Sequence, residues 1–201
     1  MTGYFRTSQA ILYWCPKTAS ILLPAGNNKM DSATSGDVNM GYYRKTVASP
    51  VGQLELLASD NGLSAILWEN EDRLRIQRQP VVDRPEHPLL LQTARQLNEY
   101  FAGERQLFEL PLDVSGTDFQ KKVWAALLTI PYGETRSYAE IAGQVGRPAA
   151  VRAVGAANGK NPLSIVVPCH RVIGSNGRLT GFAGGLTTKA YLLNLETPVL
   201  G

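Results

Sequence analysis

The chain contains few of the residues from which disulfide frameworks and zinc sites are built. Its 201 residues include two cysteines, Cys15 and Cys169, and two histidines, His87 and His170. Two cysteines far apart make no disulfide framework, and a reducing compartment therefore fits better than an oxidising one. The same four residues lack the spacing of a usual zinc site, so we expect neither a metal nor another cofactor.

Long apolar runs are also missing, and the net charge is small. No stretch approaches the roughly 20 apolar residues of a membrane helix, so we expect no membrane contact. Apolar residues still make up 44% of the chain, which is enough for a packed core. The formal net charge of +3 is too low to indicate nucleic-acid binding by itself.

The distribution of charge is more informative than its sum. Residues 112–201 carry nine Lys/Arg and five Asp/Glu, a net charge of +4. Residues 40–111 carry eight Lys/Arg and ten Asp/Glu, a net charge of −2. The C-terminal half is therefore the better candidate for contact with a polyanion.

Residues 1–39 differ from the rest of the chain. The short apolar runs 10–15 and 20–23 are each followed by a proline, and the stretch 26–39 is polar and rich in turn residues. A signal peptide needs a basic start, an unbroken apolar stretch and a small-residue cleavage site, and the fit is poor. We interpret this segment as a loosely ordered extension, or as a misassigned start with Met40 as the true first residue.

Residues 40–111 predict a small α+β domain. Short strands with turn signals between them are expected at residues 42–48, 53–58 and 63–68. Apolar residues then recur at helical spacing over residues 89–101, and Gly103 follows as a stop signal. The pattern is that of a β-meander followed by a helix.

Residues 112–201 predict a mainly helical domain. Helices are expected at residues 119–128, 138–145, 148–158 and 186–195, a buried extended segment at 163–167 and a tight turn at 174–177. Ser137 can cap the second helix, with Glu140 in its first turn. Gly146 ends that helix, and Pro148 suits the first turn of the next one.

The helices at 138–145 and 148–158 have the form of a helix-turn-helix. The second helix is rich in small residues, which let its backbone approach a partner closely, and Arg152 is its only long charged side chain. A smooth helix with one protruding cation suits a DNA groove. Alanine-rich helices also pack closely inside proteins, and on this segment alone that alternative stays open.

The strongest local signal surrounds Cys169, which follows an apolar run and directly precedes His170 and Arg171. A thiol reacts as its thiolate, and a nearby positive charge or base lowers its pKa. His170 is the expected base, and Glu196 is the available carboxylate to orient it. Neighbouring residues of an extended segment point to opposite sides, so contact between cysteine and histidine would need a turn or a bridging water. The alternative is an inert core cysteine beside a structural histidine.

Residues 41–196 resemble the O6-alkylguanine-DNA alkyltransferase family, the methylated-DNA–protein-cysteine methyltransferases. The motifs that carry the resemblance are Pro168-Cys169-His170-Arg171, Ala150-Val151-Arg152-Ala153-Val154-Gly155, Asn161-Pro162 and the loop Gly181–Gly185. The resemblance is densest over residues 119–196. It implies an α+β chain with a small β-meander/helix N-terminal domain (40–111) and a mainly helical, winged helix-turn-helix C-terminal domain (112–201) that binds DNA and carries the catalytic residues.

The resemblance also implies roles for single residues. Cys169 matches the alkyl acceptor, His170 the water-linked base, and Glu196 the carboxylate that orients the base. Asn161 matches the asparagine that braces the segment around the cysteine. Tyr138 matches the tyrosine that pushes on the phosphate of the target nucleotide and helps protonate the leaving guanine.

Further positions match the DNA-binding residues of the family. Arg152 matches the finger that enters the base stack, Arg147 and Ser175 match contacts to the DNA backbone, and the turn around Phe182 matches the lid of the base pocket. Some relatives carry a tyrosine where Phe182 stands, so a hydroxyl contact is absent here. The zinc ligands of some relatives have no counterpart in this chain.

The activity that follows from the resemblance is direct DNA repair. An alkyl group, such as methyl, would pass irreversibly from O6-alkylguanine, and also from O4-alkylthymine, in double-stranded DNA to Cys169 after nucleotide flipping. Such a suicide enzyme acts once. We expect a monomer in the cytoplasm that uses no small-molecule cofactor, associated with the nucleoid if the source is bacterial. The alternatives are a damage sensor or helix-turn-helix regulator without transfer activity, and a cysteine hydrolase that uses Cys169, His170 and Glu196.

Overall fold

The structure is a computed structural model that describes residues 41–69, 71 and 80–197. All of them belong to one compact unit, Asn39–Gly201. The interpretation of residues 1–39 lies outside the described residues. The boundary that we expect between residues 111 and 112 stays a prediction.

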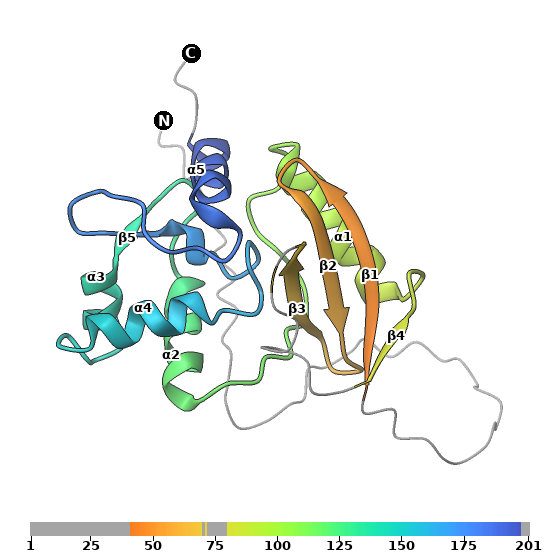
Figure 1. Ribbon diagram of the computed structural model, residues 1–201, viewed down its shortest axis with the longest axis horizontal. Helices are drawn as coiled ribbons and strands as arrows, with labels where there is room; N and C mark the ends of the chain where they lie inside the picture. Colours follow the sequence, from red (N-terminus) through yellow and green to blue (C-terminus); the bar gives the residue numbers. More distant parts are fainter. Residues whose placement is uncertain (1–40, 70, 72–79, 198–201) are drawn as a thin grey trace, which may run out of the picture. The chain divides into compact units, whose positions relative to one another are not determined.

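A four-stranded sheet in the order β3-β2-β1-β4 forms the first part of this unit (Figure 1). Its strands are β1 (Tyr42–Ser49), β2 (Gly52–Ala58), β3 (Leu63–Trp68) and β4 (Val81–Asp83). The first three strands are antiparallel neighbours, as a meander requires, whereas β4 pairs in parallel with β1. The sequence pattern predicts no strand at β4, which is three residues long and lies at the sheet edge.

Helix α1 (Pro88–Phe101) packs against β1 and β2. Proline stands at its first turn, where the missing N–H costs nothing, and Leu90, Leu97 and Tyr100 lie on its buried face. The helix begins one residue earlier than the pattern predicts. It brings Tyr100 into the main core.

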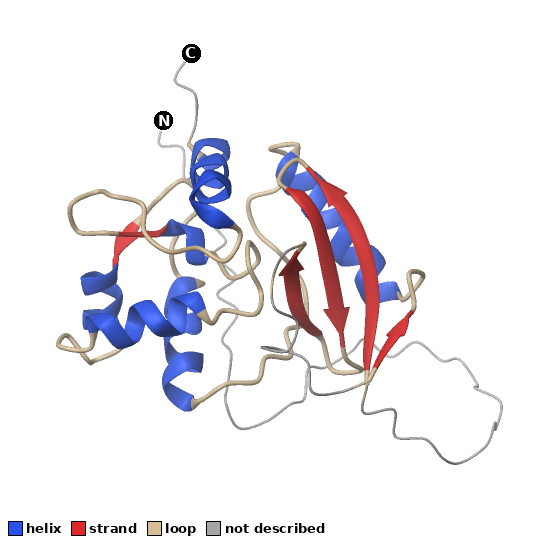
Figure 2. Cartoon of the chain, in the orientation of Figure 1, coloured by secondary structure: helices blue, strands red, loops and turns tan. Residues whose placement is uncertain are grey.

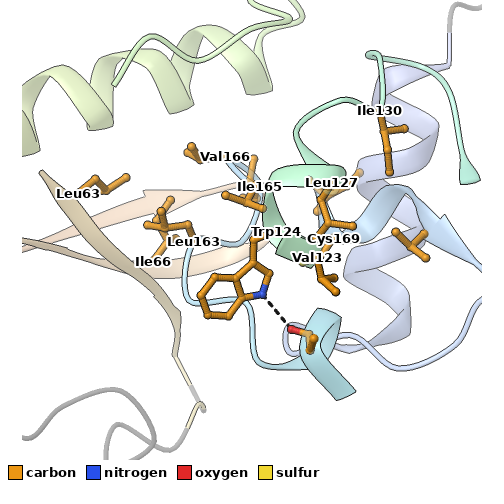
Figure 3. Packing of buried hydrophobic residues seen from close by; sticks show 14 of the residues in the cluster. Leu63, Ile66, Val123, Trp124, Leu127, Ile130, Leu163, Ile165, Val166 and Cys169 are labelled. Carbon is orange, nitrogen blue, oxygen red and sulfur yellow. Dashed lines mark hydrogen bonds between the residues drawn. The ribbon is translucent and has the colours of Figure 1, made fainter. Parts of the chain in front are cut away.

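Strands β2 and β3 are buried on both faces. Leu57, Ala65 and Leu67 form a small cluster on one face, while Leu56 and Ile66 join the main core on the other. That main core also contains residues of the C-terminal helices. Figure 3 shows Leu63, Ile66, Leu163, Trp124 and Cys169 within the same packed cluster. Residues of the sheet and of the cysteine-bearing segment therefore share one core.

Helices dominate the second part of the chain (Figure 2). They are α2 (Asp118–Leu127), α3 (Tyr138–Gln144), α4 (Val151–Gly159), the 3-10 helix η2 (Cys169–Arg171) and α5 (Gly185–Glu196). A short parallel pair, β5 (Arg136–Ser137) with β6 (Val172–Ile173), joins the residues before α3 to those after η2. The α+β fold class expected from the sequence is confirmed. Among the described residues, no helix is long and apolar enough to cross a membrane.

The local signals around the helix-turn-helix act as the sequence predicts. The Ser137 hydroxyl accepts a hydrogen bond from the Glu140 backbone at 3.2 Å, and the Glu140 carboxylate accepts one from the Ser137 backbone at 2.7 Å. At the other end of α3, Gly146 adopts a φ of +72°. The Arg147 N–H then reaches back to the Ala142 carbonyl at 2.8 Å, as in a Schellman motif. The direction in which α4 leaves is thus set by backbone hydrogen bonds.

Two local predictions are wrong. Pro148 does not open α4, because residues 148–149 form a turn and the helix begins at Val151. Residues 163–167 are buried but turned rather than extended, and the Val167 N–H donates to the Leu163 carbonyl at 2.8 Å. An apolar run of this length indicates burial, but its periodicity does not distinguish a strand from a buried turn.

Thr117 provides a test of helix capping. Its hydroxyl accepts from the Gln120 backbone at 3.3 Å, and the Gln120 side chain accepts from the Thr117 backbone at 2.8 Å. We expect Thr117→Ala to lower the free energy of unfolding by about 1 kcal/mol in urea denaturation. Thr187, exposed in the first turn of α5, is the control, and Thr187→Ala should change stability by less than about 0.5 kcal/mol. Equal losses in both variants would contradict the capping role.

Candidate active site

Cys169 is the first residue of η2, and its side chain is almost completely buried. The segment that delivers it is not a strand, so the alternation of an extended chain does not separate Cys169 from His170. Both residues belong to the same 3-10 turn. A turn is therefore present, but it does not pair the two side chains: Nδ1 of His170 has no partner among the described residues, and Nε2 faces Glu196.

Asn161 braces the loop that leads to the cysteine. Its Nδ2 donates to the Val167 carbonyl at 2.8 Å, and its Oδ1 accepts from the Leu163 backbone at 3.0 Å. Between these two points Ile165 adopts a φ of +75°, which a β-branched residue rarely does and which costs on the order of 1–3 kcal/mol. A single buried amide therefore holds both ends of a strained turn. Burial raises the pKa of the Cys169 thiol, and a hydrogen bond from the same side chain offsets part of this rise.

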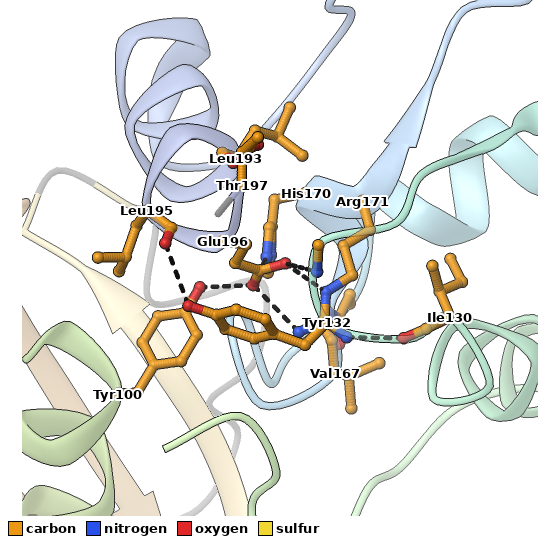
Figure 4. Close-up of polar contacts among 12 residues, drawn as sticks. Tyr100, Ile130, Tyr132, Val167, His170, Arg171, Leu193, Leu195, Glu196 and Thr197 are labelled. Carbon is orange, nitrogen blue, oxygen red and sulfur yellow. Dashed lines mark hydrogen bonds and ion pairs between the residues drawn. The ribbon is translucent and has the colours of Figure 1, made fainter. Parts of the chain in front are cut away.

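His170 is fully buried and paired with Glu196, the last residue of α5, with 2.7 Å between Nε2 and Oε1 (Figure 4). Burial raises the pKa of Glu196, but hydrogen bonds from His170 and Arg171 lower it by more, to about 2. An ionised carboxylate only accepts hydrogen bonds, so Nε2 carries the proton and Nδ1 has a free lone pair. This Nδ1 has no partner among the described residues. Burial also lowers the pKa of His170 below its usual 6.5, so the ring is neutral at neutral pH.

Glu196 accepts hydrogen bonds from three other residues as well. Arg171 donates from Nε at 2.7 Å and from Nη2 at 3.0 Å, the Tyr100 hydroxyl donates at 2.6 Å, and the Gly133 backbone donates at 3.4 Å. Arg171 donates a further bond to the Ile130 carbonyl at 2.7 Å. The guanidinium two residues after the cysteine therefore binds the carboxylate rather than the sulfur.

The environment of Cys169 does not acidify the thiol. Burial raises its pKa, and hydrogen bonds from Asn161 and Ser164 and the charge of Lys189 offset this only in part. Lys189 is itself fully buried, and its Nζ donates to the carbonyls of Val172 at 2.6 Å and Thr180 at 2.8 Å. The expectation of a lowered thiol pKa is therefore wrong for the resting protein. The thiol keeps its proton at neutral pH and needs a base when it reacts.

A pocket of about 550 Å³ lies beside these residues, within the roughly 300–1,000 Å³ range of ligand sites. It is lined by Tyr138, Val151, Arg152, Gly155, Gly159, Thr180, Gly181, Phe182 and Ala183. The Tyr138 hydroxyl accepts a hydrogen bond from Thr180 at 3.1 Å. The centroids of the Phe182 and His170 rings lie 6.5 Å apart, so the pocket comes nearest to the histidine at Phe182. Cys169 itself does not line the pocket.

The structure divides the predicted site residues into three groups. Cys169, His170, Glu196 and Asn161 form a buried cluster. Tyr138 and Arg152 line the pocket, and Arg152 is exposed on α4. Arg147 and Ser175 are exposed and lie outside the pocket lining.

Sequence reasoning misses several polar residues of this site. Tyr100, Ser164 and Lys189 are all buried and all contact the cluster or its supporting loops. Arg171 can be found from the sequence, because it stands in the same motif as the cysteine. Tyr100, Ser164 and Lys189 occur within helical or turn segments of ordinary composition, and only their burial in the folded chain distinguishes them.

The stability of this cluster should depend on pH. The pKa of Glu196 lies below its usual 4.5, at about 2, so its stabilising contribution is complete above pH 4.5 and is lost as pH falls toward 2. A shift of this size corresponds to about 3 kcal/mol. Burial also lowers the pKa of His170 in the folded protein, so the contribution of this residue to stability is likewise lost as pH falls below 6.5. Urea denaturation over this range should show the loss, and Glu196→Gln should flatten the part below pH 4.5. Identical slopes in both proteins would contradict the assignment.

Two family models match the chain and together cover most of it. Residues 42–114 match the ribonuclease-like domain of 6-O-methylguanine DNA methyltransferase, and residues 118–198 match its DNA-binding domain. A constitutive methylated-DNA–protein-cysteine methyltransferase of Bacillus subtilis is 51% identical over 161 residues, 78% of this chain and 96% of the relative. A methylated-DNA–protein-cysteine methyltransferase of Mycobacterium tuberculosis is 51% identical over 159 residues, 78% of this chain and 93% of the relative.

A solved structure agrees with these sequences. The crystal structure of Mycobacterium tuberculosis OGT in complex with DNA has a TM-score of 0.71 and 48% identity, and the match covers 78% of this chain and 96% of that one. The buried cysteine, its histidine and carboxylate, and the helix-turn-helix beside them lie within the matched domains. The chain belongs to the 6-O-methylguanine DNA methyltransferase family.

Proposed function

We propose that this chain repairs alkylated DNA directly, by moving an alkyl group from O6-alkylguanine, and also from O4-alkylthymine, in double-stranded DNA onto Cys169. The observation that carries the proposal is the buried arrangement of Cys169, His170 and Glu196 beside a pocket edged by Tyr138 and Arg152. Relatives at about 50% identity are named as methyltransferases that act on methylated DNA. Cys169 also argues against a damage sensor that lacks an acceptor.

The face of α4 that carries Arg152 would meet the DNA. Val154 and Ala157 are buried in the core, whereas Arg152 is exposed. Gly155 lines the pocket and has no side chain that would narrow it. The reacting atom of guanine lies inside the duplex, so the nucleotide has to be flipped out at a cost of a few kcal/mol. Arg152 would fill the space that the base leaves. Arg147 and Ser175, both exposed, would contact phosphates without reading the sequence.

The chemistry needs one proton to move from the thiol to the departing base. Cys169 passes its proton through a bridging water to Nδ1 of His170, and Glu196 stabilises the resulting imidazolium. The sulfur then attacks the alkyl carbon, an S–C bond forms and the C–O6 bond breaks. Tyr138 gives a proton to the leaving guanine, and its hydroxyl is free to do so because it only accepts from Thr180. The proton held by His170 returns to Tyr138 through solvent, so guanine leaves neutral.

The raised pKa of the thiol suits this sequence of events. A buried, protonated thiol is protected from side reactions, and its proton leaves only when a substrate is bound close to His170. Asn161 would keep the strained turn, and with it the sulfur, in a fixed position during the attack. The thioether product is not reversed by cellular reductants, so each molecule acts once.

The two matched domains suggest a division of work. We assign DNA binding and catalysis to residues 112–201 and a supporting role to residues 40–111, in line with the family boundary between residues 114 and 118. The reaction requires no cofactor, and one chain carries every group named above. A free acceptor thiol is best kept in a reducing compartment. We therefore place the protein in the cytoplasm, associated with the nucleoid if the source is bacterial.

Mass spectrometry tests the central claim. After mixing with a duplex that contains O6-methylguanine, the peptide with Cys169 should gain one methyl group, and Cys169→Ser should gain none. The unmethylated duplex is the control. Tight binding of the methylated duplex with no mass gain would favour a damage sensor, and repeated turnover of an ester would favour a hydrolase.

Arg152→Ala tests the flipping step. We expect it to slow transfer from duplex DNA at least about tenfold, because roughly 1.4 kcal/mol of flipping energy corresponds to that factor. Transfer from a single-stranded substrate, which needs no flipping, should change much less. Arg95→Ala removes an exposed arginine of α1 and serves as the matched control. A uniform loss on both substrates would point to a role for Arg152 other than replacing the base.

A further inference from the structure

Strand β3 lies directly against the segment that leads to the acceptor cysteine. The Ile66 N–H donates to the Pro162 carbonyl at 2.8 Å, and Ile66 forms a parallel bridge with Leu163. Side chains two residues apart on a strand point to the same face, so Ile66 and Trp68 project from the same side of β3. Both belong to the main core, which contains Leu163 and Cys169. The sheet thus presents Trp68 to the cysteine-bearing segment.

The indole of Trp68 binds the hydroxyl of Ser164, which stands in the segment that leads to Cys169. The indole Nε1 donates to Ser164 Oγ at 3.3 Å, and both residues are buried. Because the serine oxygen accepts this bond, its own O–H is left to donate. Burial raises the pKa of the Cys169 thiol, and a hydrogen bond from Ser164 offsets part of this rise. The serine hydroxyl therefore links the indole of the sheet to the segment that carries the nucleophile.

The same indole ring supports the loop over the pocket. The Phe182 ring meets it edge-on, with centroids 5.5 Å apart and an interplanar angle of 65°. Gly184 lies flat on the ring, because a Cβ there would come within 2.8 Å of two indole atoms. Phe182 lines the pocket. One side chain of β3 thus contacts both the loop over the pocket and the serine at the sulfur.

We propose that Trp68 and Ser164 are positioning residues for alkyl transfer: the indole holds the serine hydroxyl toward the sulfur while its ring supports the loop at Phe182. The inference rests on the function proposed above and extends it to the sheet, which otherwise has no assigned part in the reaction. Neither residue touches the substrate. They act by stabilising the anionic sulfur and by setting the position of the pocket wall.

The pH dependence of Cys169 reactivity tests the inference. Two rates are measured from neutral to alkaline pH: methyl transfer from an O6-methylguanine duplex, and alkylation of Cys169 by iodoacetamide, followed on the peptide because Cys15 also carries a thiol. Ser164→Ala removes the hydroxyl with little change in volume. If it raises the pKa of the thiol by one unit, the thiolate fraction at neutral pH falls about tenfold. Each thiolate becomes about threefold more nucleophilic, because reactivity rises with basicity.

The wild-type and Ser164→Ala profiles should therefore cross. The variant is about threefold slower at neutral pH and about threefold faster at alkaline pH. A variant that only loosened packing would be slower at every pH, with no change in the apparent pKa. Thermal melting of each variant establishes that the folded protein is being compared.

Trp68→Phe removes the indole N–H but keeps an aromatic ring against the loop. We expect a smaller shift of the apparent pKa in the same direction. In the double variant the shift should equal that of Ser164→Ala alone, because the indole acts on the sulfur only through the serine. Trp124→Phe is the matched control: it removes another buried indole N–H, which donates to the Ala157 carbonyl at 2.9 Å, and should leave the apparent pKa unchanged.

The outcomes separate the two proposals. If wild-type Cys169 takes up methyl but Ser164→Ala keeps the wild-type pKa in both assays, the inference is wrong and the proposed function stands. If no methyl reaches Cys169, the function is wrong, and the iodoacetamide profiles still decide whether the serine supports the thiolate. Should Trp68→Phe fail to fold, Ser164→Ala decides alone. Additive shifts in the double variant would reject the route through the serine.

Discussion

Glu196 is an ionised carboxylate in the middle of a protein core, and the surrounding residues are arranged to keep it there. Burying a charge is costly unless hydrogen bonds and an opposite charge replace the lost water. The donors come from α1, from the turn before β5 and from η2. A group that is paired in this way joins segments that are distant in sequence, and the 2.6 Å bond from Tyr100 spans 96 residues. The placement of His170 depends on this carboxylate, and in the proposed function the cysteine depends on His170.

The same burial that makes the carboxylate a stable anion keeps the thiol neutral. Five hydrogen bonds surround the carboxylate. The sulfur has weaker support from Asn161, Ser164 and the charge of Lys189, so desolvation outweighs it and raises its pKa. The result is a thiol that keeps its proton at neutral pH, followed in η2 by a histidine whose Nδ1 has no partner among the described residues. In the proposed function, the thiol becomes reactive only when a substrate approaches, which suits a nucleophile that is consumed in a single reaction.

The sheet takes part in this arrangement through its contacts with the segment before η2. Ile66 pairs with that segment through the backbone, and Trp68 reaches both Ser164 and the loop at Phe182. Strand β3 is buried on both faces, as is most of its neighbour β2, and a closely packed strand of this kind moves little. It therefore offers a firm support for a turn that contains a strained residue, Ile165. The N-terminal part of the unit and the turn before Cys169 are therefore joined by backbone and side-chain hydrogen bonds.

The sequence alone determined those features that depend on near neighbours. Turns, caps and periodic burial are local effects, so short stretches of sequence suffice to predict them. Examples are the strands β1 to β3, the capped start of α3 at Ser137, the helix end at Gly146 and the cysteine motif. Tertiary structure alone decided the turn at residues 163–167, the partner of Arg171, the sign of the pKa shift of Cys169 and the contributions of Tyr100 and Trp68. The physical reason is that desolvation and buried hydrogen bonds depend on which residues meet in the core. Tyr100 and Glu196, like Trp68 and Ser164, lie 96 residues apart along the chain, and no local sequence pattern predicts such a contact.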